Sequence, residues 1–317
     1  MKYKEYVGIL IGGLYGLLLR FIMGPEFGGN SLYDIYSIYS ISFIWVLPIV
    51  IGLTPLIVAP MEVLSTWWKP LLYPFLSELV FFLLALGSGL EDLICLIIII
   101  IPFLIGAAVV GGLLAPILRK FNSKKLYSVL ILPLVLSLVE SLLPNQVGQF
   151  TVTSKIEIDA GQALVWQNLV EVPEIAKDEY ILGFYNRIGV PRPVKSELLI
   201  KDGVEYRIGY FSDDLELWET VAHKDSLNSV SFAIHIDKSK LRDVPTDKYI
   251  LRSENFSFNE ISYALKPTLN GGTELYLSCN YTIDSKMNGY ANFWASQIVR
   301  DFEERLLHAL KLKLERV

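Results

Sequence analysis

The sequence predicts two structures in one chain. Residues 1–145 form an all-α transmembrane bundle of about five spans, and residues 149–317 form an α+β domain in which a long C-terminal helix closes a curved antiparallel sheet. Three observations support this fold class. The stretch from Leu93 to Leu118 contains no charged side chain, the composition changes from mostly apolar to an ordinary soluble mixture near residue 145, and the second half alternates apolar and polar residues before ending in an amphipathic helix.

The stretch from Leu93 to Leu118 indicates a membrane domain. Its roughly 26 residues, at about 1.5 Å each, form a rod of about 39 Å, which is longer than the ~30 Å hydrocarbon layer of a bilayer. Buried helices of soluble proteins are rarely so long and normally keep one polar face. Pro102, Pro116 and the Gly111–Gly112 pair are compatible with a span, because membrane helices tolerate both residue types.

Four further apolar segments complete the predicted bundle. The first follows Lys2 and Lys4, as the apolar part of a signal peptide would, but it contains Arg20 and no clean cleavage site follows it, so we expect a retained signal-anchor helix. The third contains Glu78 and leaves an alternative open, because a re-entrant segment there would reduce the bundle to four spans. The four segments are residues 6–23, 41–59, 71–86 and 126–143.

A basic loop at residues 119–125 sets the expected orientation. It follows the longest apolar stretch directly and contains Arg119, Lys120, Lys124 and Lys125, and such loops face the cytoplasm. Acidic turns near residues 26–34 and 91–92 then fall on the outer side. We therefore expect an integral protein of a bacterial cytoplasmic membrane, with its C-terminal domain on the extracytoplasmic face.

Ionisable residues within the spans need partners or a path to water. Arg20 and Glu140 are predicted near the outer ends of their helices, where they either pair with each other or, as we favour, extend to the headgroups. Glu78 lies deeper. We favour a carboxyl group that is hydrogen-bonded to a neighbouring helix over a proton or ion site, because a transporter would be expected to show several such residues.

The soluble half is predicted to begin with a strand at residues 149–159 and a short helix at 160–169, for which Asp159 is the expected N-cap. Three hairpins follow, and two of their turns contain glycine, at Lys201–Gly203 and Pro267–Gly272. The paired strands are residues 196–200 and 204–211, 215–223 and 229–237, and 255–266 and 273–283. A helix at about 288–315 ends the chain, and only this helix is long enough to cover the apolar face of the sheet.

Alternation along the strands predicts which side chains face that helix and line a binding site. On the helix itself, apolar residues recur at spacings of three and four, while Glu303 and its charged neighbours are predicted on the opposite side. The predicted ligand-binding residues are Tyr206, Ile208, Tyr210, Phe232, Ile234, Tyr263, Leu277, Tyr281, Trp294 and Ile298.

The run TVTSKIEIDAGQALVWQNLVEVPEI, the hairpin series, the Gly271–Gly272–Thr273 turn and the closing helix together resemble the helix-grip fold of the SRPBCC superfamily. This superfamily includes START domains, Bet v 1-like allergens and polyketide cyclase/dehydrase-like proteins. The resemblance covers about residues 149–317, and Ala163 to Val170 match the superfamily's first helix. It implies a hydrophobic cavity between sheet and helix that holds a lipid, sterol or polyketide-like molecule, and it does not imply catalysis.

Other chemistry has little support in the sequence. No nucleophile–base set, P-loop or dinucleotide fingerprint occurs, so we predict no catalytic residue and no cofactor. Three scattered histidines and two distant cysteines predict no metal site. The second half has no long basic run, so nucleic acid is not an expected partner. Adjacent predicted strands contain Arg207, Glu216, Trp218 and Glu219, which suggest a cross-strand Arg–Glu ion pair or, alternatively, a polar group at a cavity mouth that orients a ligand.

We therefore expect a membrane-anchored domain that binds a hydrophobic, lipid-like small molecule, with the lipid bilayer and that molecule as its partners. Two alternatives stay open: a cyclase- or hydrolase-like enzyme acting on a membrane-soluble substrate, and a structural or sensory module whose pocket is filled by its own rings. An acid or base with a shifted pKa that points into the interior would favour the enzyme.

Overall fold

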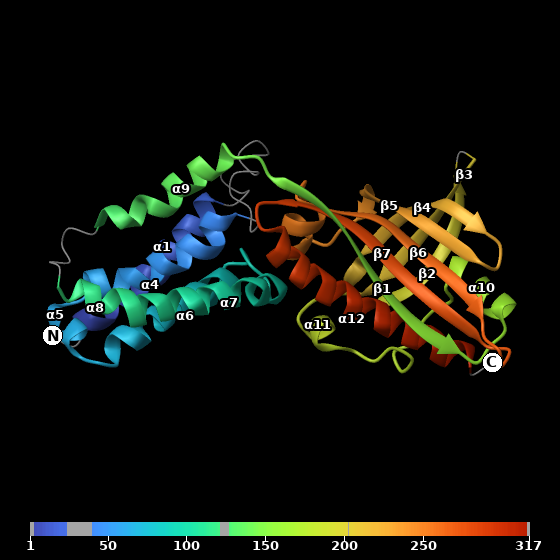
Figure 1. The fold of residues 1–317 in the computed structure, drawn as a ribbon, viewed down its shortest axis with the longest axis horizontal. Coiled ribbons are helices and arrows are strands. Elements are labelled where there is room, and N and C mark those ends of the chain that lie inside the picture. Colours follow the sequence, from blue (N-terminus) through green and yellow to red (C-terminus); the bar gives the residue numbers. More distant parts are fainter. Residues whose placement is uncertain (1–2, 24–39, 121–126, 202, 316–317) are drawn as a thin grey trace. The chain divides into compact units, whose positions relative to one another are not determined.

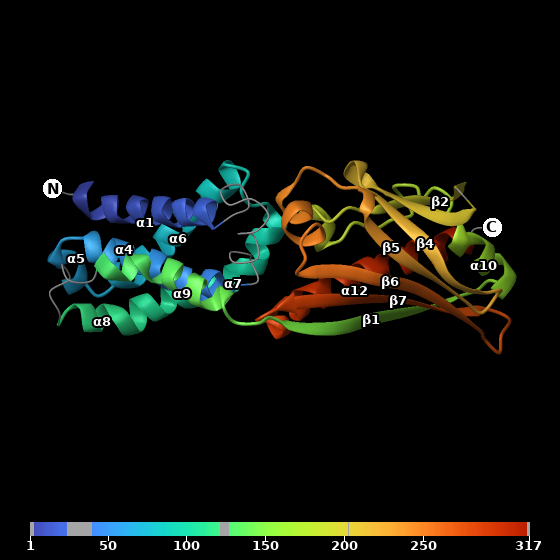
Figure 2. The same ribbon diagram turned by 90° about the horizontal axis from the view of Figure 1, so that it is seen from above.

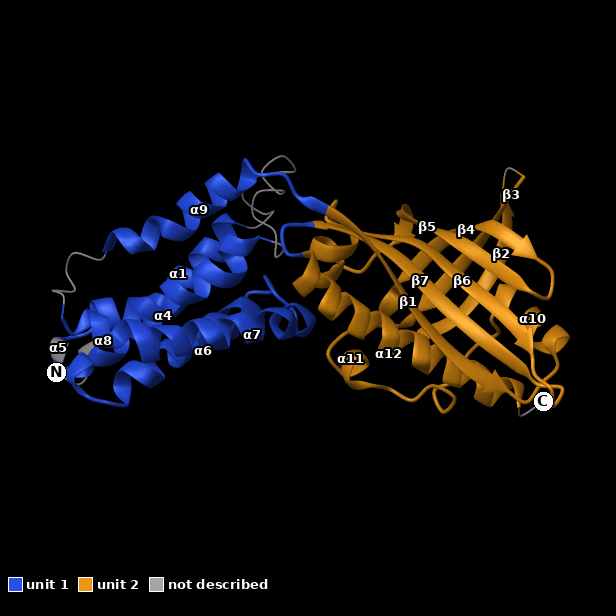
Figure 3. Ribbon diagram, in the orientation of Figure 1, with its two compact units in different colours: residues 1–146, 285–287 blue, residues 147–284, 288–317 orange. Residues whose placement is uncertain are grey.

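The computed structural model describes residues 3–23, 40–120, 127–201 and 203–315. Its contacts divide the chain into two compact units, residues 1–146 with 285–287 and residues 147–284 with 288–317 (Figure 3). The predicted acidic turn near residues 26–34 and the cations Lys124 and Lys125 lie outside the described residues.

The first unit is helical (Figure 1). Two of its long helices contain a turn of π-helix, labelled η1 and η2, that continues directly into the next α-helical segment. The elements are α1 (Tyr3–Ile22), η1 (Ser42–Val46), α4 (Leu47–Val58), α5 (Met61–Ser65), α6 (Lys69–Gly87), α7 (Leu93–Val109), η2 (Val110–Leu114), α8 (Ala115–Leu118), η4 (Tyr127–Ile131) and α9 (Leu132–Ser141).

Within the described residues, three helices are long and apolar enough to cross a membrane: Glu5–Ile22, Lys69–Gly87 and Leu93–Leu118. The predicted segments at 41–59 and 126–143 form shorter apolar helices, Ser42–Val58 and Tyr127–Ser141. The helix that contains Glu78 is therefore long enough to cross a bilayer. The helices at the second and fifth predicted spans are shorter than a typical membrane-crossing helix.

Glycines let α1 approach its neighbours closely. Gly8, Gly12 and Gly16 recur at every fourth residue, a spacing that brings small residues to one face of a membrane helix. A Cβ atom at Gly13 would lie 2.8 Å from Cβ of Val80 and 3.1 Å from the backbone nitrogen of Phe81, both on α6. Because neither atom can rotate away, only glycine fits at this contact.

The prediction for Arg20 and Glu140 is wrong, because each has another partner and neither is exposed. Arg20 of α1 forms a buried ion pair with Glu91, and its guanidinium lies 5.7 Å from the ring centroid of Phe43. Glu140 of α9 accepts hydrogen bonds of 2.7–2.9 Å from backbone and hydroxyl groups of residues 40–42, at the start of η1. A carboxylate is favoured at a helix N-terminus, where backbone N–H groups lack partners.

The prediction of a hydrogen bond from Glu78 to a neighbouring helix is also wrong within the described residues. Glu78 is buried, and neither carboxyl oxygen has a hydrogen-bonding partner among them. The adjacent Ser77 makes the expected type of interhelical contact instead, since its hydroxyl lies 3.3 Å from the carbonyl oxygens of Ile9 and Ile51.

The second unit contains a seven-stranded sheet in the order β1-β7-β6-β5-β4-β3-β2, and each pair from β2 to β7 is antiparallel. Figures 1 and 2 show the long helix α12 (Asn288–Leu314) running along the sheet. The strands are β1 (Gln146–Ile158), β2 (Pro193–Lys201), β3 (Val204–Phe211), β4 (Glu216–Asp225), β5 (Ser229–Lys240), β6 (Phe256–Pro267) and β7 (Thr273–Ser285). The smaller helices are α10 (Gln162–Val170), α11 (Phe184–Arg187), η5 (Ser212–Asp214) and η6 (Asp247–Leu251).

The turns follow local chemistry with one exception. Gly203 and Gly271 have φ values of 76° and 85°, which glycine adopts without steric cost, and they lie just before β3 and β7, respectively. Asp159 does not cap α10 as predicted. The N-cap is Gly161, because the chain first turns at Asp159, whose backbone N–H donates to Glu315 at 2.8 Å.

Candidate functional site between the sheet and the last helix

The strand register shows which side chains face α12. Phe232 lies opposite Ile261, which in turn lies opposite Cys279, so these three share the inner face of β5, β6 and β7. Arg207 lies opposite Glu219, and Glu219 lies opposite Ile234. Since directly opposed residues point to the same side of a sheet, the inner face includes a charged pair among apolar side chains.

The predicted inner face of β3 is off by one residue. Arg207, Gly209 and Phe211 point inward, and the ring of Phe211 lies 6.1 Å from that of Phe302 on α12. Tyr206, Ile208 and Tyr210 lie on the outer face, where Tyr206 contacts Trp218 edge-to-face and Lys195 lies over Tyr210. The prediction failed because apolar residues occupy the outer face of β3, while its inner face holds a buried charge.

The remaining predicted residues point inward or lie on α12. Phe232, Tyr263, Leu277 and Tyr281 are buried, with exposed fractions of 0–2%. Ile234, Trp294 and Ile298 are half-buried. No ligand role for any predicted residue is tested by these positions, so each stays a prediction.

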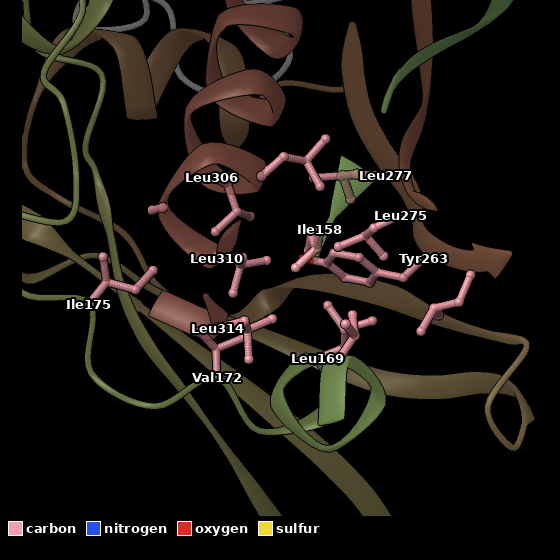
Figure 4. Close-up of a cluster of buried hydrophobic side chains, with 14 of the residues drawn as sticks. Ile158, Leu169, Val172, Ile175, Tyr263, Leu275, Leu277, Leu306, Leu310 and Leu314 are labelled. Atoms are coloured by element: carbon pink, nitrogen blue, oxygen red, sulfur yellow. The ribbon is translucent and has the colours of Figure 1, made fainter. Parts of the chain in front are cut away.

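One half of the interior is closely packed (Figure 4). There the C-terminal part of α12 meets α10 and the ends of four strands. Leu306, Leu310 and Leu314 of α12 pack with Leu275, Leu277 and Tyr263 of the sheet and with Leu169 of α10. Burial of these side chains holds the helix on the sheet, because each large apolar side chain that is buried contributes about 2 kcal/mol of transfer free energy.

Other apolar side chains between the sheet and α12 are only half-buried, and we call their region the open half. It is defined by Phe211 and Ile234 of the sheet and Ile298 of α12, and it is bordered by Ile261 and Phe302, which are also half-buried but pack against the core of the packed half. Beyond it, Tyr281 stacks on Phe150 and Phe256 at centroid distances of 5.9 and 5.6 Å, so the chain's own rings fill part of the interior.

A buried ion pair borders the open half. Nη1 of Arg207 lies 2.5 Å from Oε2 of Glu219, and Nε donates to the hydroxyl of Ser196 at 3.1 Å. The guanidinium also lies 4.5 Å from the ring centroid of Phe232. The expected cross-strand pair is therefore present, but it faces the interior rather than the solvent.

Glu303 of α12 is a second buried acid, and sequence reasoning placed it on the wrong side of the helix. Ser154 of β1 donates to its Oε2 at 2.8 Å, whereas Oε1 has no hydrogen-bonding partner in the described part of the chain. Burial raises the pKa of the Glu303 carboxyl from 4.5 to about 8, although the Ser154 bond opposes the shift. The sequence did contain a signal for this position: Glu303 lies three residues before the inner-face Leu306, so both side chains lie on the same face of the helix.

Other groups near Glu303 are also perturbed. Burial raises the pKa of the Cys279 thiol to about 12, and the charges of Glu303 and Glu219 add to the shift. Burial likewise raises the pKa of the Tyr281 hydroxyl to about 12; that hydroxyl donates to Asn292 at 2.8 Å. The described residues include no cluster of three or more histidine, cysteine or acidic side chains that could hold a metal ion.

No protein-family model matches the chain, and no curated protein matches it. Solved structures that resemble about half of it include the following three. XoxI from Bacillus cereus is 11% identical, with 52% of this chain and 94% of that chain covered and a TM-score of 0.33. The Zhui aromatase/cyclase from Streptomyces sp. R1128 is 13% identical (53% and 95% covered, TM-score 0.35), and Ms6760 from Mycobacterium smegmatis is 14% identical (54% and 97% covered, TM-score 0.31).

All three TM-scores lie below 0.5, so the fold assignment depends on the strand order and the helix. A seven-stranded antiparallel sheet that is followed by a long C-terminal helix fits the helix-grip arrangement.

Proposed function

We propose that this protein binds an apolar small molecule between the sheet and α12, in a domain that apolar helices anchor to a membrane. The observation that carries the proposal is the open half, where apolar side chains from two strands and α12 point inward yet remain half-buried. Exposed apolar surface costs about 25 cal/mol per Å², and an apolar ligand would remove that cost.

The same proposal includes the membrane arrangement. All five apolar helices cross the bilayer, and the two shorter ones are accommodated by local thinning or by flanking residues. Arg119 and Lys120 at the end of α8 lie on the cytoplasmic side, which puts the sheet unit on the outer face. Protease added outside sealed vesicles should digest the sheet unit; a sheet unit that stays protected would refute this orientation.

Native mass spectrometry of the full chain in detergent micelles tests ligand binding. The wild type should retain an apolar molecule from the membrane. Ile261→Trp, which adds bulk to the inner face, should lose it, while Ser262→Trp adds the same ring to the neighbouring residue on the opposite face and should retain it. A wild type that carries no small molecule and binds no added long-chain probe would refute the proposal.

A second candidate is acid–base catalysis on the bound molecule, and Glu303 favours it. A buried carboxyl with a pKa of about 8 is suited to exchange a proton with a bound molecule near neutral pH. If the domain is an enzyme, wild type should convert the co-purified molecule to a product of different mass or retention, and Glu303→Gln should bind it unchanged. If the wild type and Glu303→Gln yield the same products, or no product, Glu303 is not a catalytic acid or base, and ligand binding without catalysis by Glu303 describes the domain better.

A further inference from the structure

Glu303 has unused hydrogen-bonding capacity inside the sheet unit. Its exposed fraction is 1%, and Ser154 uses only one of its two carboxyl oxygens. The other oxygen, Oε1, is buried and has no hydrogen-bonding partner among the residues that the structure describes. Buried polar atoms in native proteins nearly always have partners, so this oxygen indicates a partner that the chain itself does not supply.

Other polar side chains of the interior are already engaged. Arg207 donates to Glu219 and to Ser196, and the hydroxyl of Tyr281 donates to Asn292. On α12 itself, Arg300 and Glu304 are exposed, whereas Glu303 is buried. The backbone N–H of Cys279 lies close enough to lower the pKa of the Glu303 carboxyl, but it makes no hydrogen bond to Oε1. Among the described residues, Oε1 is therefore left to a molecule from outside the chain.

Glu303 lies where the packed half meets the open half. The next inward residues toward the C-terminus of α12, Leu306 and Leu307, belong to the packed core. Toward the N-terminus, Phe302 borders the open half and Ile298 lies in it, and both are half-buried. Cys279, whose thiol is electrostatically coupled to Glu303, lies opposite the half-buried Ile261. A molecule that fills the open half thus reaches the region of Oε1.

We propose that the molecule held in the open half carries a hydroxyl group and that this hydroxyl bonds to Oε1 of Glu303. The inference rests on the binding function proposed above and adds the chemical class of the ligand, a long-chain or cyclic alcohol. A hydroxyl group both donates and accepts, so it can bond to the carboxyl group in either protonation state. A hydrocarbon would leave Oε1 unpaired, and a carboxylate would bring a second acid beside it.

Competition between matched probes tests the inference. The full chain in detergent micelles receives 1-hexadecanol and hexadecane at equal mole fraction, and native mass spectrometry measures the ratio retained. The wild type should retain the alcohol about 5- to 10-fold more strongly, the ratio expected for one buried hydrogen bond. Glu303→Leu should bind both probes equally, while Glu303→Gln, whose amide also donates and accepts, should keep a preference for the alcohol.

The outcomes separate the inference from the binding function. Equal retention of both probes by the wild type overturns the inference and leaves the binding function supported. Retention of neither probe overturns the binding function and the inference with it. Stronger retention of hexadecylamine or palmitate than of the alcohol also overturns the inference. The wild-type ratio needs no substitution, so the test does not depend on whether Glu303→Leu folds.

Discussion

Removing one member of the ion pair inside the sheet unit should be far more destabilising than removing both. Arg207 and Glu219 are only 6% and 2% exposed. Arg207→Met would leave the Glu219 carboxylate buried without a counter-ion, which costs about 3–5 kcal/mol of unfolding free energy. Methionine keeps most of the apolar contact of the arginine stem, so the packing loss is small. The lost cation–π contact with Phe232 adds about 1 kcal/mol.

The double variant Arg207→Met/Glu219→Leu should recover most of that loss. It replaces both charges with apolar side chains of similar volume, and such replacements are commonly neutral or stabilising. We therefore expect the double variant to lie within about 1 kcal/mol of the wild type, whereas the single variant falls by about 4 kcal/mol. The difference in unfolding free energy between the two variants measures the cost of burying the Glu219 carboxylate without a counter-ion.

Pulse proteolysis in urea measures this on the full chain in detergent micelles, because digestion of the sheet unit reports its unfolding separately from the helices. With a slope of about 2 kcal/mol per molar urea, Arg207→Met should lower the midpoint by about 2 M and the double variant by less than about 0.5 M. A single variant within about 0.5 M of the wild type would refute the buried pair. A double variant as unstable as the single one would show that packing, and not charge, explains the loss.

Three further predictions use the same protein. In the folded sheet unit Glu303 keeps its proton up to about pH 8, whereas the unfolded chain releases it above the ordinary pKa of 4.5. The free energy of unfolding of the sheet unit should therefore fall as pH rises from about 4.5 to about 8, by at most about 5 kcal/mol. Urea midpoints at pH 5 and 8.5 should show this fall in the wild type and not in Glu303→Gln. Gly13→Ala should destabilise the helical unit by about 1–3 kcal/mol, because its Cβ atom meets Val80 and the α6 backbone, and the melting temperature by circular dichroism should fall. Glu140→Ala should remove the acceptor of four donors at residues 40–42, three of them buried, and amide exchange of residues 41 and 42 should accelerate at least tenfold.

Each of these predictions has a matched control or a contrary outcome. Gly112→Ala adds the same methyl group where no atom lies within 4 Å, so its melting temperature should match the wild type. A pH dependence that persists in Glu303→Gln would assign the titration to another group. Unchanged exchange at residues 41 and 42 in Glu140→Ala would mean that water replaces the carboxylate there.

Local signals predicted the elements of both units. The length and apolarity of residues 93–118 predicted a helix able to cross a bilayer, and alternation with glycine-containing turns predicted the strands of the sheet. The three- and four-residue spacing of apolar side chains predicted the last helix, which the structure places at Asn288–Leu314. These signals depend on residues close together in the chain, so the sequence carries them completely.

The partners of the buried charged groups were not predictable in the same way. Arg20 meets Glu91, Glu140 meets the start of η1, and Ser154 meets Glu303 across separations of 71, 98 and 149 residues. A charged residue in the sequence predicts an exposed side chain, because a charge is costly to bury alone. Only the tertiary structure brings the compensating group to it.

Chain-local periodicity and length were enough to predict an apolar helical region followed by a sheet and a long helix, because they dictate which segments become helices or strands. Three features became visible only in the folded chain: which face of β3 turns inward, that Glu303 is buried on α12, and which inner-face side chains stay half-buried. Those features depend on strand register and on pairs of distant side chains, whose energies exist only once the sheet and the helix have come together.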